Sequence, residues 1–358
     1  MGSITTDILQ YLFSGITIGA IYAMVGLGFT MVYNSTSIIN LAQGEFVMLG
    51  GLLGVTCVAS AKASGMSPPV AVVVASVLAV GGTTLVGLLM EKLAIEPTDR
   101  LTVFHYGGMA VVAFWLCRAV AGLSMVVSAG ITVVFVAAAY LLLRNRAIES
   151  MRNPTVLQLI IITIALSILI RGVAMFTFGK DPYFMDHFVS ESPIRILGAT
   201  VLPQTLLVVA VIAAVVVLVG LFFGLTLTGK AMQACAFNRE IAKLMGINDR
   251  WMILLSFGMS AFVGAVAGYV VTPITLMDYD RGPLLALKGF GAAVLGGLGN
   301  GYGAVAAGFI LGILEALGAG LVSSGYKDAI SLIILLAVLF YRPSGLFGSA
   351  EAARFKEF

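Results

Sequence analysis

The chain has 358 residues, of which 60% are hydrophobic and only 10% are charged, and its formal net charge is +3 at pH 7. Soluble domains carry about 25% charged residues, so this composition excludes a soluble enzyme or soluble binding domain as the main body of the chain. Several continuous apolar runs approach the roughly 20 residues that a spanning helix needs, and they do not alternate as barrel strands do. We therefore predict an all-α polytopic membrane protein with one transmembrane domain over 1–358 and about ten full spans.

In chain order, the first predicted span covers about 8–32, and a second apolar run extends from about 40 to 60. The start of the second run carries polar side chains beside a glycine, namely Asn40, Gln43, Gly44 and Glu45. An ionisable group costs about 2.5–3.5 kcal/mol at the bilayer centre, so it normally faces a partner or an aqueous path. We take these four residues as candidates for a substrate path. The alternative is that Glu45 is a first-turn carboxylate near the membrane interface, stabilised by the helix dipole.

The third predicted span covers about 70–90, and a charged loop follows it. Two shorter apolar runs, within 101–145, are separated by only a few residues and predict a helical hairpin. The next span is predicted at 156–178. It is followed by the longest non-helical stretch, 179–198, which contains two prolines that break regular structure.

The longest polar segment that is predicted to be helical, 230–250, lies between two further spans, 206–227 and 251–271. We expect one continuous helix of about twenty residues, in water at one face of the membrane. Its apolar residues recur at three- and four-residue spacing and would form one narrow stripe; they are Ala234, Phe237, Ile241, Leu244 and Met245. The stripe is compatible with a linker resting on the membrane surface or with a helix that docks on a partner protein.

The apolar run at 284–298 is too short to cross the membrane comfortably, and we expect a short or re-entrant helix packed inside protein. It contains Lys288, and Glu315 lies in the following span. Both are further candidates for the substrate path, and Glu315 could instead pair with a cation across helices. Spans at 303–322 and 329–341 complete the predicted set.

Charge distribution predicts the orientation. With 230–250 in the cytoplasm, twelve of the 20 Lys and Arg residues fall on the cytoplasmic side and five fall outside. This bias follows the positive-inside rule. It predicts an N-terminus outside and a C-terminus in the cytoplasm.

Three segments carry a resemblance to a known family. Glu240-Ile241-Ala242 followed by Gly246 resembles the coupling motif of ABC importer permeases, and the surrounding Asn238-Arg239 is similar to the branched-chain amino acid branch. The segment around Glu45 and the glycine-rich run 292–304 resemble the same branch. In that family the loop at 228–250 is a cytoplasmic coupling loop held by an ATPase, which implies a coupling role for Lys230, Asn238, Arg239, Glu240, Ala242 and Gly246. The hairpin at 101–145 is extra relative to the family.

The resemblance implies a permease subunit of an ATP-driven importer for branched-chain amino acids or a related small solute such as urea, an amide or an aromatic acid. It implies a bacterial plasma (inner) membrane protein with two cytoplasmic ATPase subunits, a second homologous or identical permease, and an extracytoplasmic substrate-binding protein as partners, surrounded by lipid. ATP and Mg would be bound by the ATPases, and no nucleic acid partner is expected.

This chain itself is expected to bind no cofactor and no metal and to catalyse no reaction. Gly224, Gly229 and Lys230 approach a phosphate-binding loop, but Ala231 stands where its hydroxyl residue is required. No Ser/His/Asp arrangement at membrane depth and no cysteine spacing typical of a metal site occurs. Two alternatives stay open: a secondary transporter driven by an ion gradient, and a membrane subunit that serves assembly without transporting.

Overall fold

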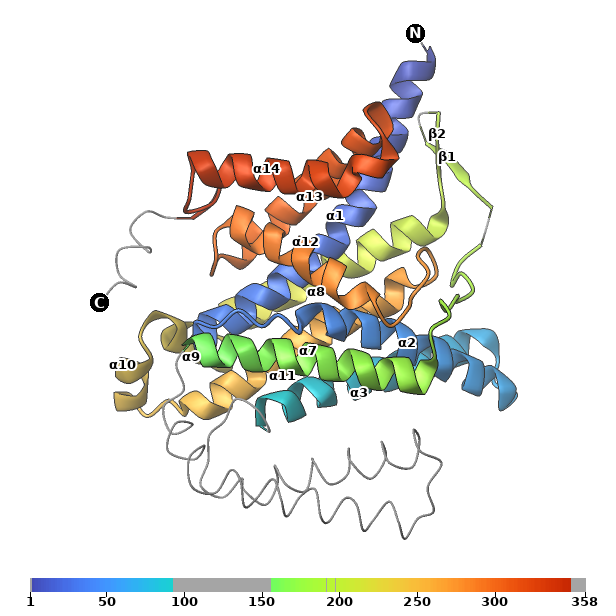
Figure 1. Cartoon of the computed structure of the whole chain (residues 1–358). Coiled ribbons are helices and arrows are strands. Elements are labelled where there is room, and N and C mark those ends of the chain that lie inside the picture. Colours follow the sequence, from blue (N-terminus) through green and yellow to red (C-terminus); the bar gives the residue numbers. More distant parts are fainter. Residues whose placement is uncertain (1, 93–155, 191, 197, 349–358) are drawn as a thin grey trace.

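A computed structural model of the protein describes residues 2–92, 156–190, 192–196 and 198–348 (Figure 1). Apart from one small β-hairpin, the regular elements in these ranges are helices. Eight of the helices are long and apolar enough to cross a membrane, so the prediction of an all-α polytopic membrane protein is confirmed. The predicted hairpin at 101–145 lies outside the described residues.

The helices follow the predicted order closely. Their bounds are α1 Gly2–Thr36, α2 Gln43–Ala63, α3 Pro68–Met90, α7 Val156–Phe178, α8 Pro203–Leu225, α9 Leu227–Phe237, α10 Arg239–Leu244, α11 Asp249–Val271, α12 Arg281–Gly296, α13 Gly301–Leu321, the 3-10 turn η2 Ser324–Tyr326, and α14 Lys327–Tyr341. Strands β1 (Ile194–Ile196) and β2 (Ala199–Val201) form the antiparallel hairpin, which the sequence pattern does not predict.

Local chemistry explains where several helices begin. Pro68 and Pro203 occupy the first positions of α3 and α8, where proline's missing N–H has no intrahelical partner to lose. Asn side chains cap three other helices by accepting a backbone N–H bond from the first turn. The capping residues are Asn238 for α10, Asn248 for α11 and Asn300 for α13.

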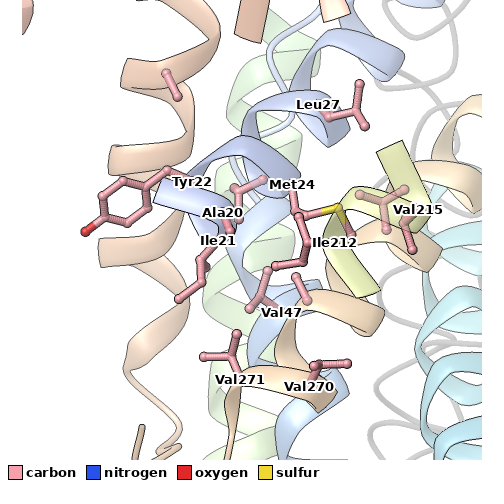
Figure 2. Packing of buried hydrophobic residues seen from close by; sticks show 14 of the residues in the cluster. Ala20, Ile21, Tyr22, Met24, Leu27, Val47, Ile212, Val215, Val270 and Val271 are labelled. Carbon is pink, nitrogen blue, oxygen red and sulfur yellow. The ribbon is translucent and has the colours of Figure 1, made fainter. Parts of the chain in front are cut away.

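The interior of the bundle is formed around α1 and α11. Their most apolar windows are 72% and 78% buried, whereas those of α7 and α14 are 17% and 6% buried. The first two helices therefore form the core, and the last two leave most of their residues outside it. Figure 2 shows side chains from several helices meeting in this core, among them Met24 of α1, Val47 of α2, Ile212 of α8 and Val270 of α11.

The start of α2 lies inside the bundle. The side chain of Gln43, its first residue, contacts Gly28 in α1 and Ser260 near the middle of α11. The segment 38–42 that precedes it is non-helical backbone whose residues are buried or half-buried. Thr163 of α7 satisfies part of it, because its hydroxyl oxygen accepts a hydrogen bond from the backbone N–H of Leu41 at 3.3 Å. Irregular backbone at depth is tolerated where protein surrounds it.

Helix α12 has 16 residues and is about 24 Å long at 1.5 Å per residue, shorter than a hydrocarbon core of about 30 Å. Its beginning lies against the first turn of α2, at Gly44 and Gly282. Its end lies against the last described residues, where the backbone N–H of Leu346 donates to the carbonyl of Leu295 at 2.7 Å. The prediction of a short helix packed in protein is confirmed.

The bundle has two distinct ends. At one end, the side-chain amide of Gln10 near the N-terminus hydrogen-bonds the backbone of Thr200 in the β-hairpin, and Lys62 pairs with Asp186 at 2.7 Å. At the other end, Asn34 near the end of α1 donates to Gly299 before α13. In Figure 1 the N-terminus and β-hairpin lie at the first end, and α10 lies at the opposite one. We call these the hairpin end and the α10 end.

Candidate functional site

The predicted helix over 230–250 is two helices. The chain leaves the helical conformation at Asn238, which is extended at φ −154° and ψ 108°. Its side-chain oxygen accepts a hydrogen bond from the backbone N–H of Ile241 at 3.0 Å and so starts α10. The prediction of one continuous helix was wrong because an N-cap residue at this position favours a new helix start over continuation.

Glycine at 246 ends α10 in a left-handed conformation. Gly246 has φ +82°, its N–H donates to the carbonyl of Lys243 at 2.9 Å, and the N–H of Ile247 donates to Ala242 at 3.0 Å. These two bonds form a Schellman motif, which satisfies carbonyls that the helix end would leave free. Residues with a Cβ rarely adopt this φ, so the motif accounts for a glycine here.

One buried side chain and one carboxylate hold α10 against its neighbours. Ala242 is 3% exposed and packs with Met232 and Cys235 of α9 and Met252 of α11. Asp249, at the start of α11, accepts a hydrogen bond from Arg239 Nε at 2.9 Å and lies 3.5 Å from Lys243 Nζ. Helix α10 is therefore fixed to α9 through packing and to α11 through charge.

The outward face of this region is apolar. Phe237 is 87% exposed, Leu244 86% and Met245 78%. Glu240 lies on the same short helix, with its side chain 81% exposed and 3.1 Å from Lys243. That hydrogen bond, followed by the charge of Asp249, raises the pKa of the Lys243 ammonium group. A monomer rarely exposes large apolar side chains together, so this face has the character of an interaction site.

The six predicted coupling residues are only partly brought together. Five of them lie at α10. Asn238 caps its start, Arg239 and Ala242 hold it against its neighbours, and Gly246 ends it. The side chain of Glu240 is exposed on the same helix. Lys230 lies instead in the first turn of α9 and is exposed.

The six predicted path residues fall into two separate clusters. In the first, Gln43 is held by Ser260: its side-chain amide donates to the Ser260 carbonyl at 3.1 Å, and the Ser260 hydroxyl donates to the carbonyl of Gly28 at 2.9 Å. Asn40 is also fully buried, and its Oδ1 accepts from the N–H of Ala42 at 3.2 Å. These two residues organise the interior start of α2.

Glu45 lies in the first turn of α2 and is 1% exposed. The Ser167 hydroxyl donates to its Oε1 at 2.7 Å, and Arg171 Nε lies 3.9 Å from the same oxygen. Arg171 also donates through Nη1 to Asp280 at 3.1 Å. Glu45 therefore is a first-turn carboxylate that is buried in the protein interior.

Gly44 forms the contact between α2 and α12. A Cβ at this position would lie 1.9 Å from the carbonyl oxygen of Gly282 and 2.7 Å from the backbone nitrogen of Ala286. The absence of a side chain is what allows the two helix starts to meet here. Gly44 thus has a packing role in the structure.

The second cluster is an ion-paired group that joins four helices. Lys288 of α12 lies 2.6 Å from Glu315 of α13 and 2.5 Å from Asp328 at the start of α14. The Tyr22 hydroxyl of α1 donates to Glu315 Oε2 at 3.0 Å. The expectation that Glu315 pairs with a cation across helices is confirmed.

Several members of these clusters were not singled out from the sequence. Ser167, Asp280, Tyr22 and Asp328 each come from an element distant in sequence from the residue they contact. Tyr22 carried one usable signal, a hydroxyl near the middle of an apolar run. The others resemble ordinary span or loop residues.

A cavity of about 810 Å³ opens at the α10 end, between α1, α8, α9 and the turn before α13. Its lining mixes aromatic side chains, among them Phe223 and Tyr302, with polar groups such as Thr30 and Asn34. Neither Glu45 nor Lys288 lines it. The cavity and the two polar clusters are therefore separate features.

Comparison with known proteins places this arrangement in a family. The family model described as the permease component of the branched-chain amino acid transport system matches residues 11–339. The chain is 28% identical to the high-affinity branched-chain amino acid transport system permease protein BraD of Pseudomonas aeruginosa, over 97% of both chains. It is 27% identical to the corresponding protein LivH of Escherichia coli, again over 97% of both.

A more distant relative is the probable branched-chain amino acid transport permease protein LivH of Methanocaldococcus jannaschii, 24% identical over 91% of this chain and 88% of that one. With eight candidate spans among the described residues, the protein is a multi-pass protein of the plasma (inner) membrane. The match over nearly the whole length, together with the helical bundle, shows that this chain belongs to the permease components of branched-chain amino acid transport systems.

Proposed function

We propose that the protein is the membrane permease of an ATP-driven importer whose solute is a branched-chain amino acid or a related small molecule, such as urea, an amide or an aromatic acid. The observation that carries this proposal is α10, a short helix with an exposed apolar face that is fixed to α9 and α11. Such an element can transmit a displacement imposed from outside. A secondary transporter or an assembly subunit has no need of it.

The proposed orientation places the α10 end in the cytoplasm and the hairpin end outside. It rests on the excess of Lys and Arg residues on the side of 228–250 and on the separation of the two ends described above. The N-terminus is then outside and the C-terminus inside. The chain then crosses the membrane with about ten full spans, counting the extra hairpin at 101–145, plus the short α12. All of it forms one permease domain, and 228–250 is its cytoplasmic coupling loop.

The proposed partners follow from these faces. Two cytoplasmic ATPases dock on α10 and its surroundings and bind the ATP and Mg, so this chain carries no cofactor. A second permease, identical or homologous, completes the membrane part, and lipid covers the remaining apolar surface. The loop 179–201 and the turn 272–280 at the hairpin end form the surface that contacts an extracytoplasmic binding protein.

Coupling can be followed from residue to residue. Helix α11 begins with Asp249, which holds α10 through Arg239, and carries Ser260, which holds Gln43 at the start of α2. A displacement of α10 therefore reaches the interior start of α2 through one rigid helix. This displacement arrives at four of the path candidates, Asn40, Gln43, Gly44 and Glu45. The other two, Lys288 of α12 and Glu315 of α13, pair with each other and are not part of this connection.

The proposal is tested with the permease and its copurifying subunits in proteoliposomes. Leucine added with the binding protein is expected to stimulate ATP hydrolysis, and uptake should persist when an uncoupler abolishes ion gradients. Uptake that stops with the uncoupler, while ATP remains available, would establish a secondary transporter. ATP hydrolysis without any uptake by the intact complex would leave only the assembly role.

Glu240 is expected to act on a partner and not on its own chain. Its side chain is exposed, and its pair with Lys243 is at the surface, where such pairs contribute little stability. Replacing Glu240 with Lys should leave folding unchanged and reduce leucine uptake about tenfold, since charge reversal at an interface disrupts docking. The double variant E240K/K243E exchanges the two charges and keeps their pair, although it removes the contact between Lys243 and Asp249; uptake that recovers in it would show that the role is intramolecular.

Gly246 offers a matched pair of variants. Ala at this φ is strained by about 1–2 kcal/mol, whereas Asn adopts the left-handed region more readily. Nothing in the described chain lies within 4 Å of a Cβ at 246, so neither variant clashes internally. Gly246→Ala is expected to speed hydrogen exchange in 238–248 and to lower uptake, with Gly246→Asn closer to the natural protein. Equal defects in both variants would point instead to a partner that needs the space.

A further inference from the structure

Glu45 and Arg171 form an incompletely satisfied pair of opposite charges inside the membrane part. Glu45 Oε2 is buried and has no hydrogen-bond partner among the described residues, and the same holds for Arg171 Nε. The two side chains are 3.9 Å apart at their nearest atoms, too far for a hydrogen bond. Buried polar atoms in proteins are nearly always hydrogen-bonded. Glu45 Oε2 therefore needs a donor from elsewhere, and Arg171 Nε needs an acceptor.

The surrounding contacts fix both groups in place. Ser167 holds Glu45 Oε1, which leaves Oε2 as the oxygen that lacks a donor. Asp280 binds Arg171 through Nη1, so the edge of the guanidinium group that carries Nε is left without a partner among the described residues. That edge suits a carboxylate, because a guanidinium group binds carboxylates through two parallel N–H bonds.

Gly282 lies directly against the carboxylate. A Cβ at this position would lie 2.2 Å from Glu45 Oε2, so a larger residue here would displace the side chain of Glu45. The site also faces the start of α12, where the backbone dipole favours negative charge.

The pair is reached from the hairpin end. The side chain of Arg171 is 30% exposed and that of Asp280 is 63% exposed, whereas that of Glu45 is 1% exposed. Asp280 belongs to the turn after α11, which also carries Met277, paired through its backbone with Tyr183 of the loop 179–198. A solute released at this end meets Asp280 and Arg171 before it reaches Glu45.

We infer that Glu45 and Arg171 read the two charged groups of a zwitterionic α-amino acid as it passes, with Glu45 binding the ammonium group and Arg171 the carboxylate. An ammonium group supplies the donor that Oε2 lacks, and a carboxylate supplies the acceptor that Nε lacks. A zwitterion has no net charge, so the charge of the site stays constant while it is occupied. This inference rests on the proposed function and names the chemistry of its path.

The test uses a reporter thiol in the full permease complex, with Cys57, Cys117 and Cys235 replaced by Ala. Ser167→Cys places the thiol beside Glu45, and its reaction with 2-aminoethyl methanethiosulfonate is timed. Leucine is expected to slow that reaction at least tenfold more than leucinamide, which lacks the carboxylate, or 4-methylpentanoate, which lacks the ammonium group. Ser331→Cys, a buried serine of α14, serves as the control that leucine should not protect.

Uptake by charge-neutral variants provides the second readout. Glu45→Gln and Arg171→Gln should each lower the maximal leucine uptake rate at least tenfold, measured per assembled complex after copurification of the subunits. Equal protection by all three compounds, or natural uptake rates in both variants, would overturn the inference and assign the two orphan atoms to water. If the natural complex takes up no leucine, the proposed function fails, and the protection pattern still decides whether a zwitterion site exists.

Discussion

Lys288→Met is expected to destabilise the protein by about 3–5 kcal/mol, because it leaves Glu315 buried without its cation. Glu315 is 2% exposed, and Lys288 Nζ is 2.6 Å from its Oε1. Asp328, the other carboxylate on Lys288, has a side chain that is 55% exposed and can be solvated when Lys288 is removed. The free energy of unfolding in mixed micelles measures the effect.

The matched control removes the whole buried group. In the triple variant K288M/E315L/Y22F no buried charge or hydroxyl is left without a partner, and most of the lost stability is expected to return, since replacing a buried ion pair with apolar residues is often neutral or stabilising. Leucine uptake by that variant then separates two roles. Natural uptake would make the group a staple between α12, α13 and α14, and lost uptake in a stable protein would place it on the solute path. A stable Lys288→Met protein would contradict the burial argument.

Gly44→Val is expected to prevent native packing of α2 on α12, at a cost of about 3 kcal/mol, the upper part of the usual range for overpacking. The cost is high because the atom that a Cβ would meet at 1.9 Å is the backbone oxygen of Gly282, which cannot rotate away as a side chain would. Folded yield in membranes and thermal unfolding in detergent are the measurements. The control is Gly81→Val in α3, where nothing lies within 4 Å of an added Cβ.

Failure of this prediction would take a recognisable form. If Gly44→Val folds normally but does not transport, then the glycine provides space for the solute and not for α12. If it folds and transports normally, the interior start of α2 is not where the structure places it.

The spans could be predicted because membrane burial leaves a direct mark on composition. Helix α7 has the predicted bounds, and α3 and α13 differ from prediction by two residues at most at either end. The short α12 could also be foreseen, because its apolar run is visibly too short. What marks these elements is the length of a continuous apolar run, which needs no knowledge of the rest of the chain.

The break at Asn238 and the β-hairpin were missed for a different reason. Asn238 interrupts a pattern that keeps helical periodicity on both sides, so only its capping chemistry, followed by Glu240 in the first turn, signalled a new helix. The strands have three residues each, too few for an alternating pattern to be recognised.

Only some members of the polar clusters could be predicted from the sequence. Glu45, Lys288 and Glu315 are conspicuous because charge is rare in apolar runs. Their partners are not, since Ser167 lies 122 residues from Glu45, and only the packing of α7 against α2 brings them together. Sequence pattern finds the residue that needs a partner, and the fold decides which residue that is.

The two caps of α10 have a consequence for how a partner associates with this protein. A six-residue helix does not persist alone in water, but this one is closed at both ends by Asn238 and Gly246 and laid on its neighbours by Ala242. A protein arriving at Phe237 and Leu244 finds the surface in its final shape. Little conformational freedom is then lost on association, so the speed of docking should be governed by diffusion and charge, with no slow folding step.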